Sequence, residues 1–181
     1  MTTTKTSDPL SNLQFQSSND AKKDGFIKLK KDSSIKVRIF TTNPTIHVNN
    51  FGKEQISFAV WNWDEDKAMI LSKGPSIARA ISAIHQDDDF GADVTKVDIK
   101  ITSTSTGPEI TDVEHTINVL PKAADISDAQ LEALEELDKK LSTINKGSVR
   151  AEEYNNGVKP QVFHPDDGEP VTDIELTAIP F

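Results

Sequence analysis

Cationic and aromatic side chains recur at regular spacing in the first two-thirds of the chain, often alternating with apolar residues. Holding single-stranded nucleic acid without reading its sequence requires two features. Cations must replace the counterions of the phosphates, and flat rings must offer surfaces on which bases stack. The candidate strand-binding residues are Lys28, Lys30, Lys36, Arg38, Phe40, Phe51, Lys53, Trp61, Trp63, Lys96 and Lys100.

An acidic segment at the C-terminal end is a second candidate site. It finishes on Ile-Pro-Phe, and a terminal ring with its carboxylate suits capture by an apolar pocket with a basic rim on a partner protein. The acids would add long-range attraction to basic partners, and the segment could also compete with nucleic acid for the chain's own cations. The candidate partner-binding residues are Asp166, Asp167, Glu169, Asp173, Glu175, Ile179, Pro180 and Phe181.

Neither a catalytic site nor a metal site is expected. The four histidines are scattered and never stand three or four residues apart, and the absence of cysteine excludes disulfides and thiolate metal ligands. No glycine-rich phosphate loop or nucleophile elbow occurs. The acidic run at 87–89 could bind a divalent ion, but a solvated loop after a helix is the favoured interpretation. We therefore expect a protein that is not an enzyme and needs no cofactor.

The net charge of −9 is distributed unevenly along the chain. Residues 21–122 carry 14 basic and 14 acidic residues, whereas residues 123–181 carry 5 basic and 13 acidic ones. A neutral body followed by an acidic end leaves a nucleic-acid partner open despite the overall charge. The first residues lack the apolar run of a secretion signal, and no stretch is long and apolar enough to span a membrane. We expect a cytoplasmic protein, located in the host cytoplasm if it is viral.

The elements that must position the candidate residues are short strands. Apolar and polar residues alternate with period two, which is typical of half-buried strands with one basic face. In 55–63 this alternation places Phe58 in the core and puts Trp61 and Trp63 on the outward face. The expected strands cover 26–30, 35–40, 45–51, 55–63, 68–71, 97–101 and 117–119.

A short helix is predicted between the early and late strands. Gly74-Pro75-Ser76 is a helix start, and apolar residues at helical spacing follow from Ile77 to Ile84. Strands, one short helix and then two strands is the order of a five-stranded OB-type Greek-key barrel, so the predicted fold class is all-β.

The chain divides into four expected parts. Residues 1–20 are a flexible arm, and residues 21–122 are the OB-fold domain for single-stranded DNA. Residues 123–147 form an amphipathic helix, which either packs on the barrel or lies at a partner interface. Residues 148–181 are expected to be a disordered acidic tail.

The order of these motifs resembles that of the OB-fold single-stranded DNA-binding proteins of tailed bacteriophages. The resemblance rests on Phe-Ile-Lys-Leu-Lys at 26–30, Ile-Lys-Val-Arg-Ile at 35–39 and the segments 58–64, 67–71, 90–91 and 97–102. The Ile-Pro-Phe ending is similar to the tails of bacterial and phage proteins of this class. Some phage members hold zinc between early strands, which this cysteine-free chain does not support.

The resemblance implies a protein that coats single-stranded DNA in phage-type replication, recombination and repair. Its tail would recruit polymerase, helicase or primase, and the protein would be a monomer or a homodimer. One alternative is a single-strand annealing or RNA-binding protein on the same barrel. An alternative of another class is a protein–protein adaptor or virion component with no affinity for nucleic acid.

Overall fold

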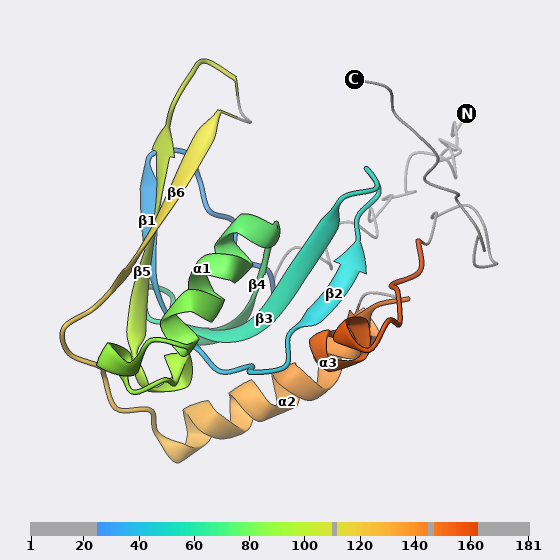
Figure 1. Cartoon of the computed structure of the whole chain (residues 1–181). Coiled ribbons are helices and arrows are strands. Elements are labelled where there is room, and N and C mark those ends of the chain that lie inside the picture. The colour runs from blue at the N-terminus through green and yellow to red at the C-terminus, as the bar shows by residue number, and fades with distance from the viewer. Residues whose placement is uncertain (1–24, 110–111, 145–146, 163–181) are drawn as a thin grey trace, which may run out of the picture.

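The computed structural model of the chain describes residues 25–109, 112–144 and 147–162, and over these residues the chain is mostly β (Figure 1). The strands are β1 (Ser33–Ile39), β2 (Thr45–Val48), β3 (Glu54–Asn62), β4 (Lys67–Lys73), β5 (Asp98–Ser105), β6 (Val113–Val119) and β7 (Val149–Arg150). The helices are α1 (Pro75–His85), α2 (Asp128–Ile144) and α3 (Ala151–Asn155), with short 3₁₀ helices η1 (Asp88–Phe90) and η2 (Val94–Lys96). The predicted helix after the fourth strand is confirmed as α1.

The strands form one antiparallel seven-stranded sheet in the order β6-β5-β1-β3-β2-β7, with β4 on the other edge of β3. One edge of β3 is shared, because β1 pairs with its C-terminal half and β2 with its N-terminal half. The sheet is not closed: among the described strands β4 pairs only with β3, and β6 only with β5. Helix α1 contacts both β4 and β6 beside this opening.

The main core lies on the face of the sheet that α1 covers. Along each strand, every second side chain points to this face, and most of these side chains are apolar, as a half-buried strand requires. Phe58 is buried there, as the sequence predicted. The buried members of this core are Ile27, Val37, Ile39, Phe58, Val60, Met69, Leu71, Ile77, Ile81, Val94, Ile99 and Ile101.

Helix α2 covers part of the opposite face. It contacts β3 and β4, and in Figure 1 it runs beside β2 and β3 along the bottom of the view. Leu141 is fully buried and clusters with Ala59 and Ile70, while Phe40 and Leu137 pack at the margin. Of the two expectations for this amphipathic segment, packing on the sheet is the one that the structure confirms.

The expected first strand at 26–30 is absent. Phe26 forms only an isolated parallel bridge with Ile70 on the outer edge of β4. The amide of Ile27 donates to the carbonyl of Ile70 at 2.9 Å, and the amide of Ile70 donates to the carbonyl of Gly25 at 2.7 Å. The alternation in this segment therefore reflects the packing of Ile27 and Leu29 against the core rather than a strand.

The expectation of disorder from residue 148 onward is wrong for β7 and α3. β7 pairs with β2, and the Arg150 guanidinium binds Asp138 of α2 at 3.1 Å. The Tyr154 hydroxyl of α3 donates to Glu54 of β3 at 2.7 Å. Elements of two and five residues are too short to show periodicity, so the composition alone gave no sign of them. In the described ranges, no helix has the length and apolar character needed to cross a bilayer.

Removing the Leu141 side chain should test how α2 is held on the sheet. We expect Leu141→Ala to lower the free energy of unfolding by about 2–5 kcal/mol, because it leaves a cavity between α2 and the sheet. Urea denaturation followed by circular dichroism measures this loss. Leu131→Ala is the matched control, because Leu131 lies on the same helix with 41% of its surface exposed. An equal loss for both variants would mean that α2 is not anchored through Leu141.

Candidate nucleic-acid interface

A buried carboxylate organises the face of the sheet that carries the predicted cations and rings. Asp98 is fully buried at the start of β5, directly opposite Arg38 in the pairing of β1 with β5. One of its oxygens accepts from Arg38 Nε at 2.9 Å and from Trp63 Nε1 at 2.8 Å. The other accepts from the amide of Ala124 at 2.8 Å. The buried charge is therefore paired and fully hydrogen-bonded, as burial requires.

The prediction that Arg38 faces nucleic acid is wrong. Arg38 is 6% exposed, and beyond Asp98 its guanidinium donates to the carbonyls of Ala124 at 3.0 Å and Thr95 at 3.4 Å. Period-two alternation placed Arg38 on the correct face. It could not show that residues 120–127, which lead into α2, cross that face.

Trp61 and Phe40 are also unsuitable as open stacking platforms. Trp61 is 6% exposed, and its buried Nε1 has no hydrogen-bond partner among the described residues. Phe40 is half-buried against the cluster that Leu141 of α2 forms with the sheet. The prediction of outward-facing rings is therefore wrong for Trp61, and Phe40 contributes to the contact with α2.

Trp63 follows β3 and is held at the border of the covered area. Its ring is half-buried, with its centroid 6.4 Å from that of Trp61 and the two planes at 68°. The bond from Nε1 to Asp98 fixes one edge of the indole, and its backbone amide donates to the carbonyl of Lys36 at 3.0 Å. Trp63 is thus a partly exposed ring with a fixed orientation.

One predicted cation, Lys36, lies over this ring, and a second, Lys100, lies on the next strand. Lys36 and Lys100 are directly opposite each other on β1 and β5, so their side chains share one face. The Lys36 ammonium lies 5.5 Å from the Trp63 ring centroid and 3.9 Å from Asp98 Oδ2. Lys100 is exposed and forms no ion pair with any described residue. Like charges placed directly opposite each other repel, and the Asp98 carboxylate, which pairs with Arg38 at 2.9 Å, also attracts the Lys36 ammonium.

Small polar side chains extend this area across three strands. Ser34 pairs with Thr102 and Thr102 with Thr116, while Lys100 pairs with Asn118. We call the resulting surface the open face, and it consists of Ser34, Lys36, Lys100, Thr102, Thr116 and Asn118, with Trp63 at its border. The sequence analysis missed the four hydroxyl and amide residues. The signal that could have predicted their positions was the alternation of these polar residues with Ile101 in β5 and Ile117 in β6.

The remaining predicted residues lie outside the open face. Phe51 is 85% exposed in the turn between β2 and β3, and Lys53 follows it there. The Asn49 side chain accepts from both of their amides at 3.0 Å, which shapes this turn. Lys28 and Lys30 are exposed in the segment before β1.

Lys96, in η2, is engaged by a neighbouring acid. Its ammonium forms an ion pair with Asp93 at 3.2 Å. A hydrogen bond from the Thr95 hydroxyl, supported by Lys96, lowers the pKa of Asp93. The Lys96 side chain nevertheless remains 75% exposed.

The predicted tail residues, from Asp166 to Phe181, lie outside the described residues. Within the described ranges, no cluster of three or more histidine and acidic side chains is arranged to hold a metal ion. No protein family, curated protein or solved structure matches this chain. The open face itself therefore provides the evidence for function.

Asp98→Asn should test whether this carboxylate holds the interface together. We expect a loss of about 3–5 kcal/mol in the free energy of unfolding, because the change leaves the buried Arg38 without its counter-charge. Urea denaturation measures the loss, and a changed near-ultraviolet circular dichroism spectrum should report a freed Trp63. Asp93→Asn is the control, since it removes an acid of the same type that pairs with the exposed Lys96. Similar small losses in both variants would contradict the role of Asp98.

Proposed function

We propose that this chain binds single-stranded DNA through the open face, without sequence preference. The observation that carries the proposal is the cross-strand pair of Lys36 and Lys100, with the Lys36 ammonium over the ring of Trp63, whose Nε1 is held by Asp98. Cations and a partly exposed ring on one face of a sheet supply the two elements that sequence-tolerant strand binding needs.

A phosphate group suits the space between the two lysines. Their ammonium groups repel each other in the free protein, and an anion between them turns that repulsion into attraction. Binding there would also release counterions from the nucleic acid, which is the main source of affinity in such complexes. The carboxylate of the exposed Asp64 accepts the Lys36 amide at 3.0 Å, and the exposed Glu114 lies on the same face of β6 as Thr116 and Asn118.

Trp63 favours an unpaired strand over a duplex. A ring can stack with a base only when the base is not enclosed in a double helix. In the free protein the Lys36 ammonium lies over this ring, and such a contact is worth only about 0.5–1 kcal/mol at an exposed site. To leave the indole surface to a base, Lys36 must also give up its ion pair with Asp98 at 3.9 Å, and a phosphate oxygen would be the replacement partner.

The pairing order of the strands supports an OB-type barrel. β1 pairs with β3, β3 with β4, β1 with β5 and β5 with β6, and α1 stands between β4 and β5 in the chain. These are the neighbours expected in that fold, apart from the missing pair between β4 and β6. The second and third strands of OB folds usually form the binding face. In this chain β3 and β4 carry α2 there, so the binding surface is displaced toward β1, β5 and β6.

In the cell, such a protein would coat transient single strands during replication, recombination or repair of the phage type. Because it would bind the unpaired state preferentially, it would melt secondary structure by mass action. Phe51 and Lys53 offer a further contact for a strand that reaches the turn between β2 and β3. The acidic tail would recruit replication proteins.

Tryptophan fluorescence can identify the ring that meets the bases. Trp61→Phe leaves Trp63 as the single tryptophan and removes no hydrogen bond of Nε1 with the described residues, while an aromatic ring still fills most of the buried site. We expect oligo-dT to quench this variant at low salt and added NaCl to restore the emission. Trp63→Phe is the matched control, which retains only the buried Trp61 and should be quenched far less. Quenching confined to the Trp63→Phe variant would refute the assignment.

The salt dependence of binding should report the two lysines. Replacing Lys36 and Lys100 together with Gln should reduce the slope of log K against log [NaCl] by roughly 1–2, because each lost phosphate contact removes about 0.7 from the slope for a single strand. Fluorescence anisotropy of a labelled oligo-dT measures the slope. Lys122→Gln with Lys139→Gln removes the same charge outside the open face, and this control should preserve the slope. Equal slopes in all three proteins would exclude the lysine pair from phosphate contact.

A further inference from the structure

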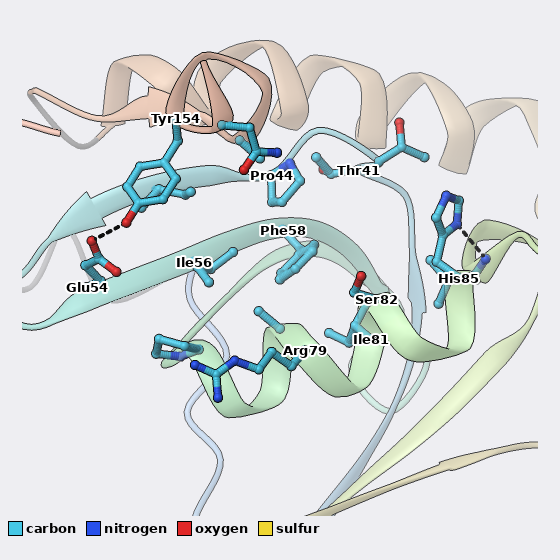
Figure 2. A pocket seen from close by; sticks show the side chains of 17 residues that line it. Thr41, Pro44, Glu54, Ile56, Phe58, Arg79, Ile81, Ser82, His85 and Tyr154 are labelled. Atoms are coloured by element: carbon cyan, nitrogen blue, oxygen red, sulfur yellow. Dashed lines mark hydrogen bonds between the residues drawn. The ribbon is translucent and has the colours of Figure 1, made fainter. Parts of the chain in front are cut away.

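A cleft of about 500 Å³ lies on the other side of the sheet from the open face (Figure 2). It is bounded by α1, by β2 and β3, and by α3. Its volume lies within the range of roughly 300–1,000 Å³ that is typical of small-molecule sites. None of the residues of the open face lines it.

The inner walls of the cleft are apolar. Ile56 and Phe58 of β3 face Ala78 and Ile81 of α1 across the space, as Figure 2 shows for the labelled side chains. Phe58 and Ile81 also belong to the main core, so this part of the cleft is fixed by the packing of the whole domain. A rigid apolar slot of this kind suits a flat ring.

The polar lining combines one guanidinium and one carboxylate with hydroxyl, amide and imidazole groups. Arg79 is exposed at the cleft and forms no hydrogen bond or ion pair with the described residues. His85 Nδ1 accepts from the amide of Val94 at 3.3 Å, so the neutral ring carries its proton on Nε2. The one carboxylate of the lining, Glu54, already accepts from the Tyr154 hydroxyl.

We propose that this cleft binds a single nucleotide unit, with the base in the apolar slot and the phosphate on Arg79. This inference rests on the proposed function and adds a second contact for nucleic acid. A guanidinium without another partner can bind a phosphate through two parallel hydrogen bonds. The base is planar and rigid, so it can bury its faces between α1 and β3 with little loss of conformational entropy.

The charges around the cleft favour a nucleotide over an acidic peptide. Glu152 and Glu153 are exposed on α3, next to the lining residues Tyr154 and Asn155. A peptide with several carboxylates would extend toward these acids and be repelled. A nucleotide places its negative charge on one group, which can lie at Arg79 on the α1 side of the cleft.

Binding of dTMP to the full chain, followed by amide chemical shifts in ¹⁵N-labelled protein, is the direct test. We expect shifts along α1 and β3, and affinity that falls about tenfold or more in Arg79→Gln, because a charge-assisted hydrogen bond is lost. Ala78→Leu should abolish binding by filling the slot. Lys122→Gln and Ala83→Leu are the controls, since Ala83 is exposed on α1 outside the cleft. If Ala78→Leu does not fold, Arg79→Gln still decides the question.

Additional binding measurements distinguish a failure of this inference from a failure of the proposed function. The variant with Gln at both Lys36 and Lys100 should bind dTMP normally while its affinity for oligo-dT falls. Oligo-dT binding without dTMP binding in the unaltered protein would overturn the cleft proposal and leave the proposed function standing. Equal affinity for inorganic phosphate and dTMP, equal affinity of Arg79→Gln and the unaltered protein, or preference for an acidic peptide would also overturn it. Displacement of dTMP by oligo-dT would show that a strand supplies the nucleotide, and simultaneous binding would show that it is a free one.

Discussion

The hydrogen bonds of the buried Asp98 carboxylate determine how one face of this sheet is used. A charge taken out of water is tolerated only when it is paired and its oxygens are satisfied. Arg38, Trp63 and the Ala124 amide supply those partners, and they come from β1, from the end of β3 and from the segment that leads into α2. The same carboxylate therefore joins two strands, orients an indole and fixes the point from which α2 starts across the sheet. The border between the covered and the open parts of this face follows from these bonds.

The two faces of the sheet are used differently. On one face α2 buries the apolar residues of β3 and β4, while β1, β5 and β6 display lysines, hydroxyls and an amide. On the other face α1 completes the main core and, together with α3, borders a cleft lined by apolar residues and several polar groups, Arg79 among them. Under the proposed function, the open face provides the contacts with phosphates along a strand. The cleft, in contrast, has the dimensions and the single cation that suit one nucleotide.

The sequence predicted the local structure well wherever periodicity was the controlling signal. Alternation located β1, β3, β4 and β5 and placed Phe58 in the core, and helical spacing located α1 and α2. Period two assigns a side chain to a face but does not show what covers that face, so Arg38 and Trp61 were expected in contact with solvent. In the segment at 26–30, apolar and polar residues alternate because its apolar side chains pack on the core, and no ladder of strand hydrogen bonds forms. β7 and α3 have too few residues to show a periodic pattern. The lysine pair at 36 and 100 depends on the register between distant strands, which only the folded chain supplies.

The contacts of α1 beside the gap in the sheet have a consequence for behaviour at high concentration. A sheet that does not close leaves strand edges whose free backbone groups can pair with another molecule and start aggregation. Here α1 contacts both β4 and β6, and the backbone of Gly25 and Ile27 bonds to β4 at Ile70. Edge strands with a helix or another segment packed beside them are poor templates for strand addition. These contacts therefore protect neighbouring copies from joining their sheets into fibrils at high concentration.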